Sequence, residues 1–163
     1  MAVQILAATV SSKIIAVDLR DEALQLASQV GAHHTVRSDR DAADHVRELV
    51  GPSPGGADVV LDVVGAPPTI DLARAVVSTG GDVAIVGLAG GALAVGFGSV
   101  PLETRVVVPF WGTKAELAEV IALARAGRIT AHIERFPLAD AGTAYDKLRA
   151  GRISGRAVVV PAA

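Results

Sequence analysis

The sequence predicts an α/β fold built on a mostly parallel sheet, and three observations lead to this prediction. Short apolar runs alternate with segments that repeat apolar residues at helical spacing. Only 3% of the 163 residues are aromatic while 51% are hydrophobic, so small aliphatic side chains must fill the core, as in parallel sheets buried on both faces. The Pro- and Gly-rich stretch 52–56 is too short for a domain linker, so we expect residues 1–163 to form a single domain.

Helices are predicted where apolar residues recur every three or four positions. Ala23, Leu26, Ala27 and Val30 form the expected inner face of one helix; Leu117, Val120, Ile121 and Ala124 form that of another, which begins at the capping-box sequence Thr113–Glu116 and ends at Gly127. The remaining helices are expected at residues 2–8, 39–50, 67–77 and 140–150.

Strands are predicted in the apolar runs between these helices. The run Ala57–Val64 is almost continuously apolar and is therefore expected to be central in the sheet. The other expected strands are Ile14–Asp18, His34–Val36, Asp82–Val86, Arg105–Pro109, Ile129–Glu134 and Arg156–Val160. Strands that alternate with helices at this spacing imply right-handed crossovers and parallel pairing.

The acidic residue Asp18 ends the first of these runs and identifies the type of sheet. In doubly wound, Rossmann-like folds, an acidic residue at the tip of the second strand follows a G-x-G-x-x-G turn by about 20 positions. Counting back from Asp18 by that distance passes Met1, so we expect the first strand and the glycine-rich turn to be lacking.

The strand order 3-2-1-4-5-6 places that first strand between Ile14–Asp18 and Ala57–Val64. Both strands would then have unpaired edges, which favour association. We therefore expect the isolated chain to be poorly soluble, to close the gap by moving the two strands together, or to fill it from another chain.

Candidate binding residues follow the expected strands, because ligands of open parallel sheets bind beyond the carboxyl ends of the strands. These ends are Asp18, Val63–Gly65, Val86–Leu88 and Phe110–Gly112. Gly65 and Gly87 suit either the close approach of a ligand or an ordinary turn.

Asp18 is suited to accept hydrogen bonds from a ribose diol, and this predicts a preference for NAD over NADP. Repulsion between its carboxylate and a 2′-phosphate about 4 Å away would cost roughly 4 kcal/mol. Arg20, two residues later, weakens this preference because an arginine can accept a 2′-phosphate. Alternatively, Asp18 only starts a turn or caps the helix that follows.

Other kinds of site find little support in the sequence. The four histidines form no convergent metal site, no G-x-S-x-G elbow is present, and the glycine-rich stretch 87–98 matches neither phosphate-binding motif and is interpreted as a connector. A net charge of −2 provides no basic patch for nucleic acid. No apolar stretch reaches the roughly 18 residues of a membrane span. Without cysteine, a cytoplasmic location is the default expectation.

Seven short sequence segments, in their order and spacing, resemble one family, the medium-chain, zinc-dependent alcohol dehydrogenases, and specifically their C-terminal cofactor domain. The segments are Ala2–Leu6, Ile15–Asp18, Gly31–His34, Ala57–Gly65, Gly80–Gly87, Pro109–Thr113 and Gly155–Val159. The likeness covers nearly the whole chain, which is similar to that domain from just past its glycine motif.

The resemblance implies roles for individual residues. Asp18 would bind the adenosine ribose, Trp111 would lie near the carboxamide and Arg156 would reach the pyrophosphate. The nicotinamide half would be lined by Val63, Val64, Val86, Gly87 and Leu88. The family's catalytic zinc, which polarises the alcohol oxygen, belongs to its other domain, so neither catalytic residues nor metal ligands are assigned to this chain.

The sequence therefore leaves two alternative functions open. One is the cofactor-binding part of an NAD-dependent alcohol dehydrogenase, a fragment inactive alone, whose family likeness also suggests dimerisation through the strand near Arg105–Pro109. The other is a non-catalytic module that binds a nucleotide or only itself.

Overall fold

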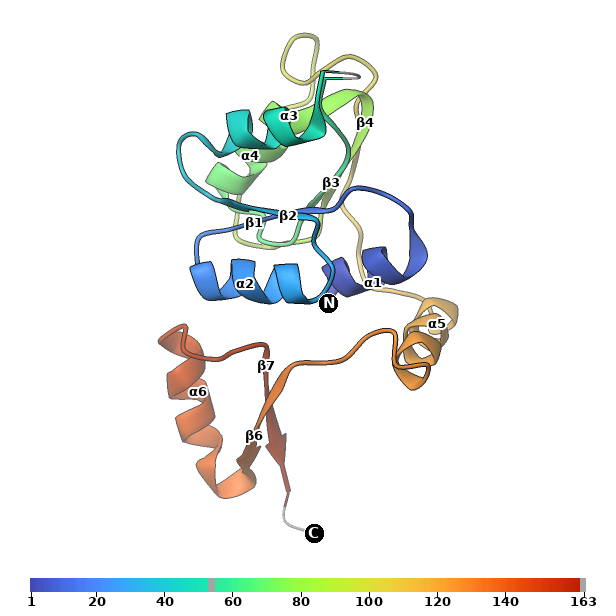
Figure 1. The fold of residues 1–163 in the computed structure, drawn as a ribbon. Coiled ribbons are helices and arrows are strands. Elements are labelled where there is room, and N and C mark those ends of the chain that lie inside the picture. The colour runs from blue at the N-terminus through green and yellow to red at the C-terminus, as the bar shows by residue number, and fades with distance from the viewer. Residues whose placement is uncertain (53–54, 162–163) are drawn as a thin grey trace.

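The computed structural model describes residues 1–52 and 55–161 and has alternating helices and strands (Figure 1). The helices are α1 (Ala2–Thr9), α2 (Asp21–Gln29), α3 (Ala42–Val50), α4 (Pro67–Val76), α5 (Lys114–Arg125) and α6 (Ala141–Arg149), with a 3-10 turn η1 (Leu138–Asp140) before α6. The strands are β1 (Ile15–Asp18), β2 (His34–Arg37), β3 (Ala57–Asp62), β4 (Val77–Ile85), β5 (Arg105–Val107), β6 (Ile133–Pro137) and β7 (Arg156–Val160).

Parallel pairing was predicted, and every strand pair in the described part of the chain is parallel. The pairs are divided among three sheets with the orders β1-β2, β3-β4-β5 and β6-β7. The prediction of an α/β fold with parallel strands is therefore confirmed, but the strands do not form one continuous sheet.

The free edges of β1 and β3 correspond to the expected gap. Within the described residues, β1 pairs only with β2, and β3 pairs only with β4. Ile15 and Val17 of β1 nevertheless pack against the same buried cluster as Val60 of β3. The two strands thus flank one core without hydrogen-bonding to each other, so the gap has not closed in the single chain.

Helices cover both faces of the first sheet. α3 and α4 lie on one side of β1 and β2, and α1 and α2 on the other (Figure 1). The core beneath α3 and α4 is formed by Val36, Ala42, Val46 and Val76. A second cluster, Ala73, Val77 and Val83, joins α4 to β4. This covering on two faces is the doubly wound arrangement that the sequence predicts.

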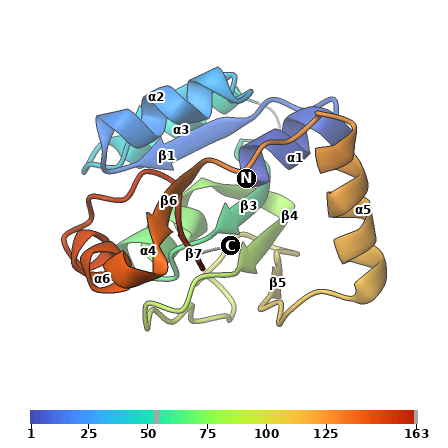
Figure 2. The same cartoon turned by 90° about the horizontal axis from the view of Figure 1, so that it is seen from below.

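The C-terminal unit, which comprises β6, η1, α6 and β7, lies on the far side of α1 and α2 from β1 and β2 (Figure 1). Figure 2 views the same arrangement from below. The side-chain amide of Gln4 in α1 accepts a hydrogen bond from Thr130 N at 2.7 Å and donates one to Thr130 O at 3.0 Å. These two hydrogen bonds connect α1 to the segment that leads into β6.

Predictions were wrong for β3 and α5. β3 was expected to be central in the sheet, but it is an edge strand of the sheet β3-β4-β5. Val59 is 57% exposed and Leu61 is also exposed, because the free edge and outer face of β3 are uncovered. α5 begins at its predicted capping box, in which Thr113 Oγ1 accepts from Glu116 N at 3.2 Å. Its expected buried stripe contains no buried residue, however, because no described element covers that face.

Element boundaries moved by three or more residues in three places. β4 begins five residues before the predicted Asp82, and α3 starts at Ala42 rather than at residue 39 because the Asp39 carboxylate caps a turn at Asp41 N. The predicted strand Ile129–Glu134 is replaced by β6, which begins at Ile133. The loop 52–56 includes residues 53–54, which lie outside the described residues. Among the helices described, none is long and apolar enough to cross a membrane.

Candidate functional site

The end of β1 positions Asp18 and Arg20. Asp18 is the last residue of the strand, and its Oδ1 accepts a hydrogen bond from Arg20 N at 2.9 Å. Arg20 Nε lies 4.0 Å from the same oxygen, and both side chains are exposed to solvent. Asp18 therefore starts the turn into α2, as one of the two predictions stated, but it does not cap that helix. Its role toward a ribose stays a prediction.

An open groove of about 1320 Å³ runs between the α1–α2 layer and the C-terminal unit. We call it the arginine groove, after the four arginines among its lining residues: Arg20, Arg128, Arg152 and Arg156. Glu22 is the only acidic residue of this lining. Met1, at the N-terminus of α1, also borders the groove, and helix N-termini attract anions. The groove is therefore suited to a ligand that carries negative charge.

The arginines of the groove differ in the contacts that their side chains make with the rest of the chain. Arg128 donates a hydrogen bond to the carbonyl oxygen of Ala8 at 2.7 Å, at the end of α1. Arg156 is exposed at the start of β7 and makes no ion pair with any described residue. Its guanidinium is thus available to a ligand.

The wall of the groove formed by α2 differs from the sequence prediction. The predicted inner face of α2, formed by Ala23, Leu26, Ala27 and Val30, borders the arginine groove and is only half-buried. Leu24 is the buried residue of this helix. The apolar spacing correctly indicated a helix, but its predicted inner face borders the groove and is not fully buried.

A buried carboxylate, Asp62, organises the end of β3. Asp62 is 5% exposed, and its Oδ1 accepts hydrogen bonds from Val64 N at 2.9 Å and Gly65 N at 2.8 Å. Its Oδ2 accepts from the hydroxyl of Thr69 at 2.8 Å. Thr69 Oγ1 in turn accepts from Ala66 N at 3.1 Å. We call these five residues the Asp62 network; it fixes the turn between β3 and α4.

The glycines at the ends of β3 and β4 touch each other. A Cβ on Gly87 would lie 1.9 Å from the carbonyl carbon of Val64, and one on Gly65 would lie 2.3 Å from the oxygen of Gly87. Gly65 also has φ of +69°, a conformation that glycine adopts without strain. Contact between two turns of the backbone explains both glycines, so neither a ligand nor an isolated turn is needed to account for them.

The apolar residues predicted beside these glycines are exposed to solvent. Val63, Val64 and Val86 flank the two turns, and Leu88 is almost fully exposed. Trp111 is 85% exposed, has φ of +61° and packs edge-to-face on Phe110 with ring centroids 5.6 Å apart. Strained backbone of this kind clusters at functional sites. These side chains are free to contact a ligand or another protein surface.

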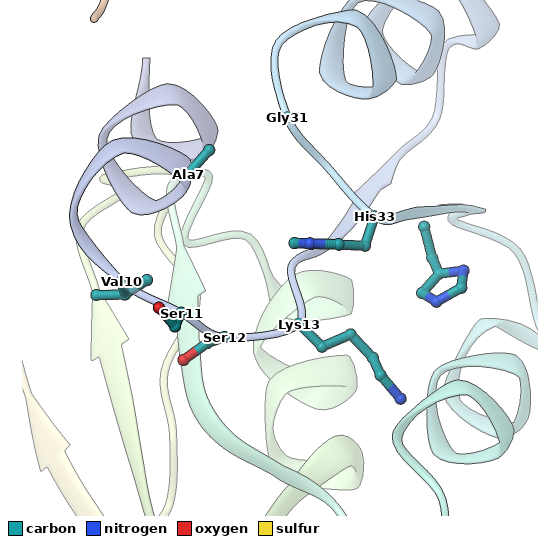
Figure 3. Close-up of a pocket in the computed structure, with 8 residues that line it drawn as sticks. Ala7, Val10, Ser11, Ser12, Lys13, Gly31 and His33 are labelled. Carbon is teal, nitrogen blue, oxygen red and sulfur yellow. The ribbon is translucent and has the colours of Figure 1, made fainter.

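A smaller pocket of about 470 Å³ lies beside Gly31 and His33, near the start of β1 and away from the predicted residues (Figure 3). The His33 ring points into the space in front of Ala7, and its Nδ1 accepts a hydrogen bond from Ile14 N at 3.0 Å. Lys13 points away and donates to Leu49 O at 2.6 Å. His33 thus has a structural role. Within residues 1–52 and 55–161, no group of three His, Asp or Glu residues is arranged to hold a metal ion.

Apart from Trp111, which lies between β5 and α5, the predicted site residues fall into two groups. Arg20 and Arg156 border one groove, with Asp18 beside Arg20, whereas Val63–Gly65 and Val86–Leu88 meet at the ends of two paired strands. Sequence reasoning missed Asp62, Arg128 and Arg152. Asp62 could have been noticed as a charged residue near the end of an apolar run, whereas the arginines come from separate segments and show no such pattern.

Comparison with known proteins decides the family. The family model described as zinc-binding dehydrogenase matches residues 1–126. The chain belongs to this family. The predicted resemblance is thereby confirmed.

Relatives within the zinc-binding dehydrogenases are similar over nearly the whole chain. An NAD-dependent alcohol dehydrogenase from Sulfurisphaera tokodaii is 30% identical over 99% of this chain, which spans 47% of that protein. The crystal structure of the alcohol dehydrogenase from Aeropyrum pernix matches with a TM-score of 0.81 at 32% identity, over 98% of this chain and 46% of that one. A D-arabinose 1-dehydrogenase (NADP(+)) from Saccharolobus solfataricus is 28% identical over 87% of this chain, which spans 39% of that protein. The fold is Rossmann-type, and the chain spans between 39% and 47% of the length of these relatives.

Proposed function

We propose that this chain is the cofactor-binding part of an NAD-dependent alcohol dehydrogenase. The observation that carries this proposal is the arginine groove, in which Arg20 and Arg156 border the same space as the start of α1. Guanidinium groups and a helix N-terminus both favour phosphate oxygens. Names of relatives, among them an NAD-dependent alcohol dehydrogenase, support the same assignment.

In this proposal each group of residues binds one part of the cofactor. Asp18 accepts hydrogen bonds from the adenosine ribose, with Arg20 beside it, and Arg156 binds the pyrophosphate. The nicotinamide half lies against the exposed residues at the ends of β3 and β4, with Trp111 near the carboxamide. When bound, the nicotinamide ring accepts or donates a hydride.

We propose NAD before NADP because the Asp18 carboxylate is exposed at the strand end and opposes a 2′-phosphate. Arg20 lies 4.0 Å from that carboxylate and offsets part of the repulsion. One relative is named for NADP, so the discriminating measurement is the ratio of the two affinities. Asp18→Asn should bring the ratio of NAD affinity to NADP affinity closer to one, because the amide removes the negative charge that opposes the 2′-phosphate.

Alcohol oxidation is not expected from the chain alone. The family's zinc does not fit the residues described, which contain no cysteine and no metal-binding group of His, Asp and Glu. No catalytic step is therefore assigned to this chain. Zinc-dependent turnover of an alcohol by the purified 163 residues would contradict this part of the proposal.

Titration of NAD against the whole chain tests cofactor binding. A ligand that binds only the folded state at 100 times its Kd stabilises it by about 2.7 kcal/mol, which appears as a raised melting temperature. ATP, which shares the adenosine and phosphates but not the nicotinamide, serves as the comparison ligand. Absence of any thermal shift at millimolar NAD would contradict cofactor binding.

A second candidate function is a self-associating module that has kept only the fold. It is favoured by the unpaired edges of β1 and β3 and by the exposed apolar side chains of Phe97, Phe110 and Trp111. Association through β5, at the edge of its sheet, would produce a homo-oligomer. Sedimentation across a concentration series tests this association. A chain that stays monomeric throughout the series, melts cooperatively and does not bind NAD would exclude it. A cytoplasmic location stays a prediction.

A further inference from the structure

Asp62 is the most unusual residue of β3 because it is an acid buried in an apolar surrounding. It follows Val60 and Leu61 and is 5% exposed. Burial of a carboxylate is costly unless hydrogen bonds compensate it. No cation pairs with Asp62 among the described residues, so the compensation comes from the donors of the Asp62 network.

These donors belong to the turn that carries the predicted nicotinamide contacts. Val64 N and Gly65 N both point at Asp62 Oδ1, which orients the backbone on which Val63 and Val64 present their exposed side chains. Thr69 Oγ1 bonds both Asp62 Oδ2 and Ala66 N, so it fixes the start of α4 to the same carboxylate. Asp62 and Thr69 thus hold this turn from beneath.

The end of β4 rests on this turn. The carbonyl oxygen of Asp62 accepts hydrogen bonds from Val86 N at 2.8 Å and Gly87 N at 3.0 Å. Ala89 N donates to Val64 O at 3.1 Å, and the contact between Gly65 and Gly87 allows this approach. A displacement of the first turn would therefore also move Val86–Leu88.

We propose that Asp62 and Thr69 are positioning residues, which set the pose of the nicotinamide half of a dinucleotide through the turns at the ends of β3 and β4. The inference rests on the proposed function. Neither side chain touches the cofactor; both act through Val63–Gly65 and Val86–Leu88. The adenosine half depends instead on Asp18 and the arginine groove, which the Asp62 network does not contact.

A ligand pair separates positioning from general stability. NAD and ADP-ribose share the adenosine, the pyrophosphate and a ribose, but only NAD carries the nicotinamide ring. The affinities of both are measured by calorimetry on the full chain for Asp62→Ala and Thr69→Val. Asp62→Asn and Thr69→Ser are the matched controls, since Asn keeps one carbonyl oxygen for the two N–H donors and Ser keeps the hydroxyl.

We expect Asp62→Ala to weaken NAD binding by about tenfold and Thr69→Val by about threefold, because buried donors and acceptors lose their partners and the turn shifts. ADP-ribose affinity should change less than twofold in both variants, and both controls should bind NAD nearly as the unsubstituted chain does. If Asp62→Ala does not fold, Thr69→Val alone provides the measurement.

The outcomes separate this inference from the proposed function. Selective loss of NAD affinity supports the inference. Equal loss of both ligands, or no loss of either, overturns it while leaving the proposed function intact. Failure of the unsubstituted chain to bind either ligand overturns both.

Discussion

The ends of β3 and β4 and the end of β1 present their predicted binding residues in different ways. At β3 and β4, buried groups and backbone contacts hold the turns: Asp62 bonds the turn after β3, and Gly87 of the turn after β4 packs against that same turn. At β1, Asp18 and Arg20 are exposed side chains beside an open groove. The first region gains its geometry on folding, whereas the second must order its side chains when a ligand binds.

Because of this difference, substitutions in the two regions should change different quantities: the stability of the fold in one and the affinity for a ligand in the other. A substitution at the ends of β3 and β4 disturbs buried contacts and should lower the free energy of unfolding. A substitution of an exposed arginine of the groove removes charge from solvent-facing positions and should change affinity with little change in stability.

Gly87→Ala should have the largest effect on stability. Its Cβ would lie 1.9 Å from the Val64 carbonyl carbon, and the resulting backbone displacement should lower the free energy of unfolding by about 3 kcal/mol. Urea unfolding followed by circular dichroism measures this. Gly142→Ala is the control, because its Cβ meets open space at the start of α6 and should be neutral or stabilise by about 0.5 kcal/mol. Equal effects of the two variants would contradict the close approach at Gly87.

Arg156→Ala should reduce NAD affinity by about tenfold, which corresponds to about 1.4 kcal/mol, with an unchanged melting temperature. The reason is that its guanidinium forms no ion pair with a described residue and borders the groove. Arg149→Ala is the matched control, since Arg149 is exposed on α6 and lies 3.8 Å from Asp146. The assignment of Arg156 to the pyrophosphate is wrong if both variants bind NAD equally well.

Thr113→Ala should destabilise α5 locally by about 1 kcal/mol, because the helix loses its capping hydroxyl. Hydrogen exchange of the α5 amides measures the effect, and Thr113→Ser should restore protection. Unchanged protection of the α5 amides in Thr113→Ala would contradict the capping role.

Glu134 should make the C-terminal unit weakly dependent on pH. Hydrogen bonds from Ser154 N and from Lys147 Nζ lower the pKa of this carboxyl below its usual value. Because the pKa is lower in the folded state, the stabilisation is complete above the unfolded pKa and is lost as the pH falls through the folded one. Acid titration of the β6 and β7 amide signals should show this loss, and Glu134→Gln should remove the pH dependence.

Local patterns predicted most helices and strands. β1, α2, α4 and β7 lie close to their predicted positions because apolar spacing, Pro67 and the acidic start of α2 act within a few residues. The capping box of α5 is also a local interaction, so it too was predictable.

Burial and site geometry depended on neighbours that no local pattern reveals. The stripe of α5 and the outer face of β3 have the composition of buried surfaces, yet no described element covers them. Asp18 could be proposed from the sequence because a carboxylate at the carboxyl end of a parallel strand is positioned to meet a ligand. Asp62 was missed because its function is visible only when the turn folds back over it.

The paired hydrogen bonds between the Gln4 side chain and Thr130 close a loop of more than a hundred residues. Contacts between residues so distant in sequence raise the contact order of a fold and are slow to form. Completion of the arginine groove therefore requires an encounter between nearly opposite parts of the chain. Folding kinetics of Gln4→Ala would reveal that encounter as a step separate from the formation of each sheet.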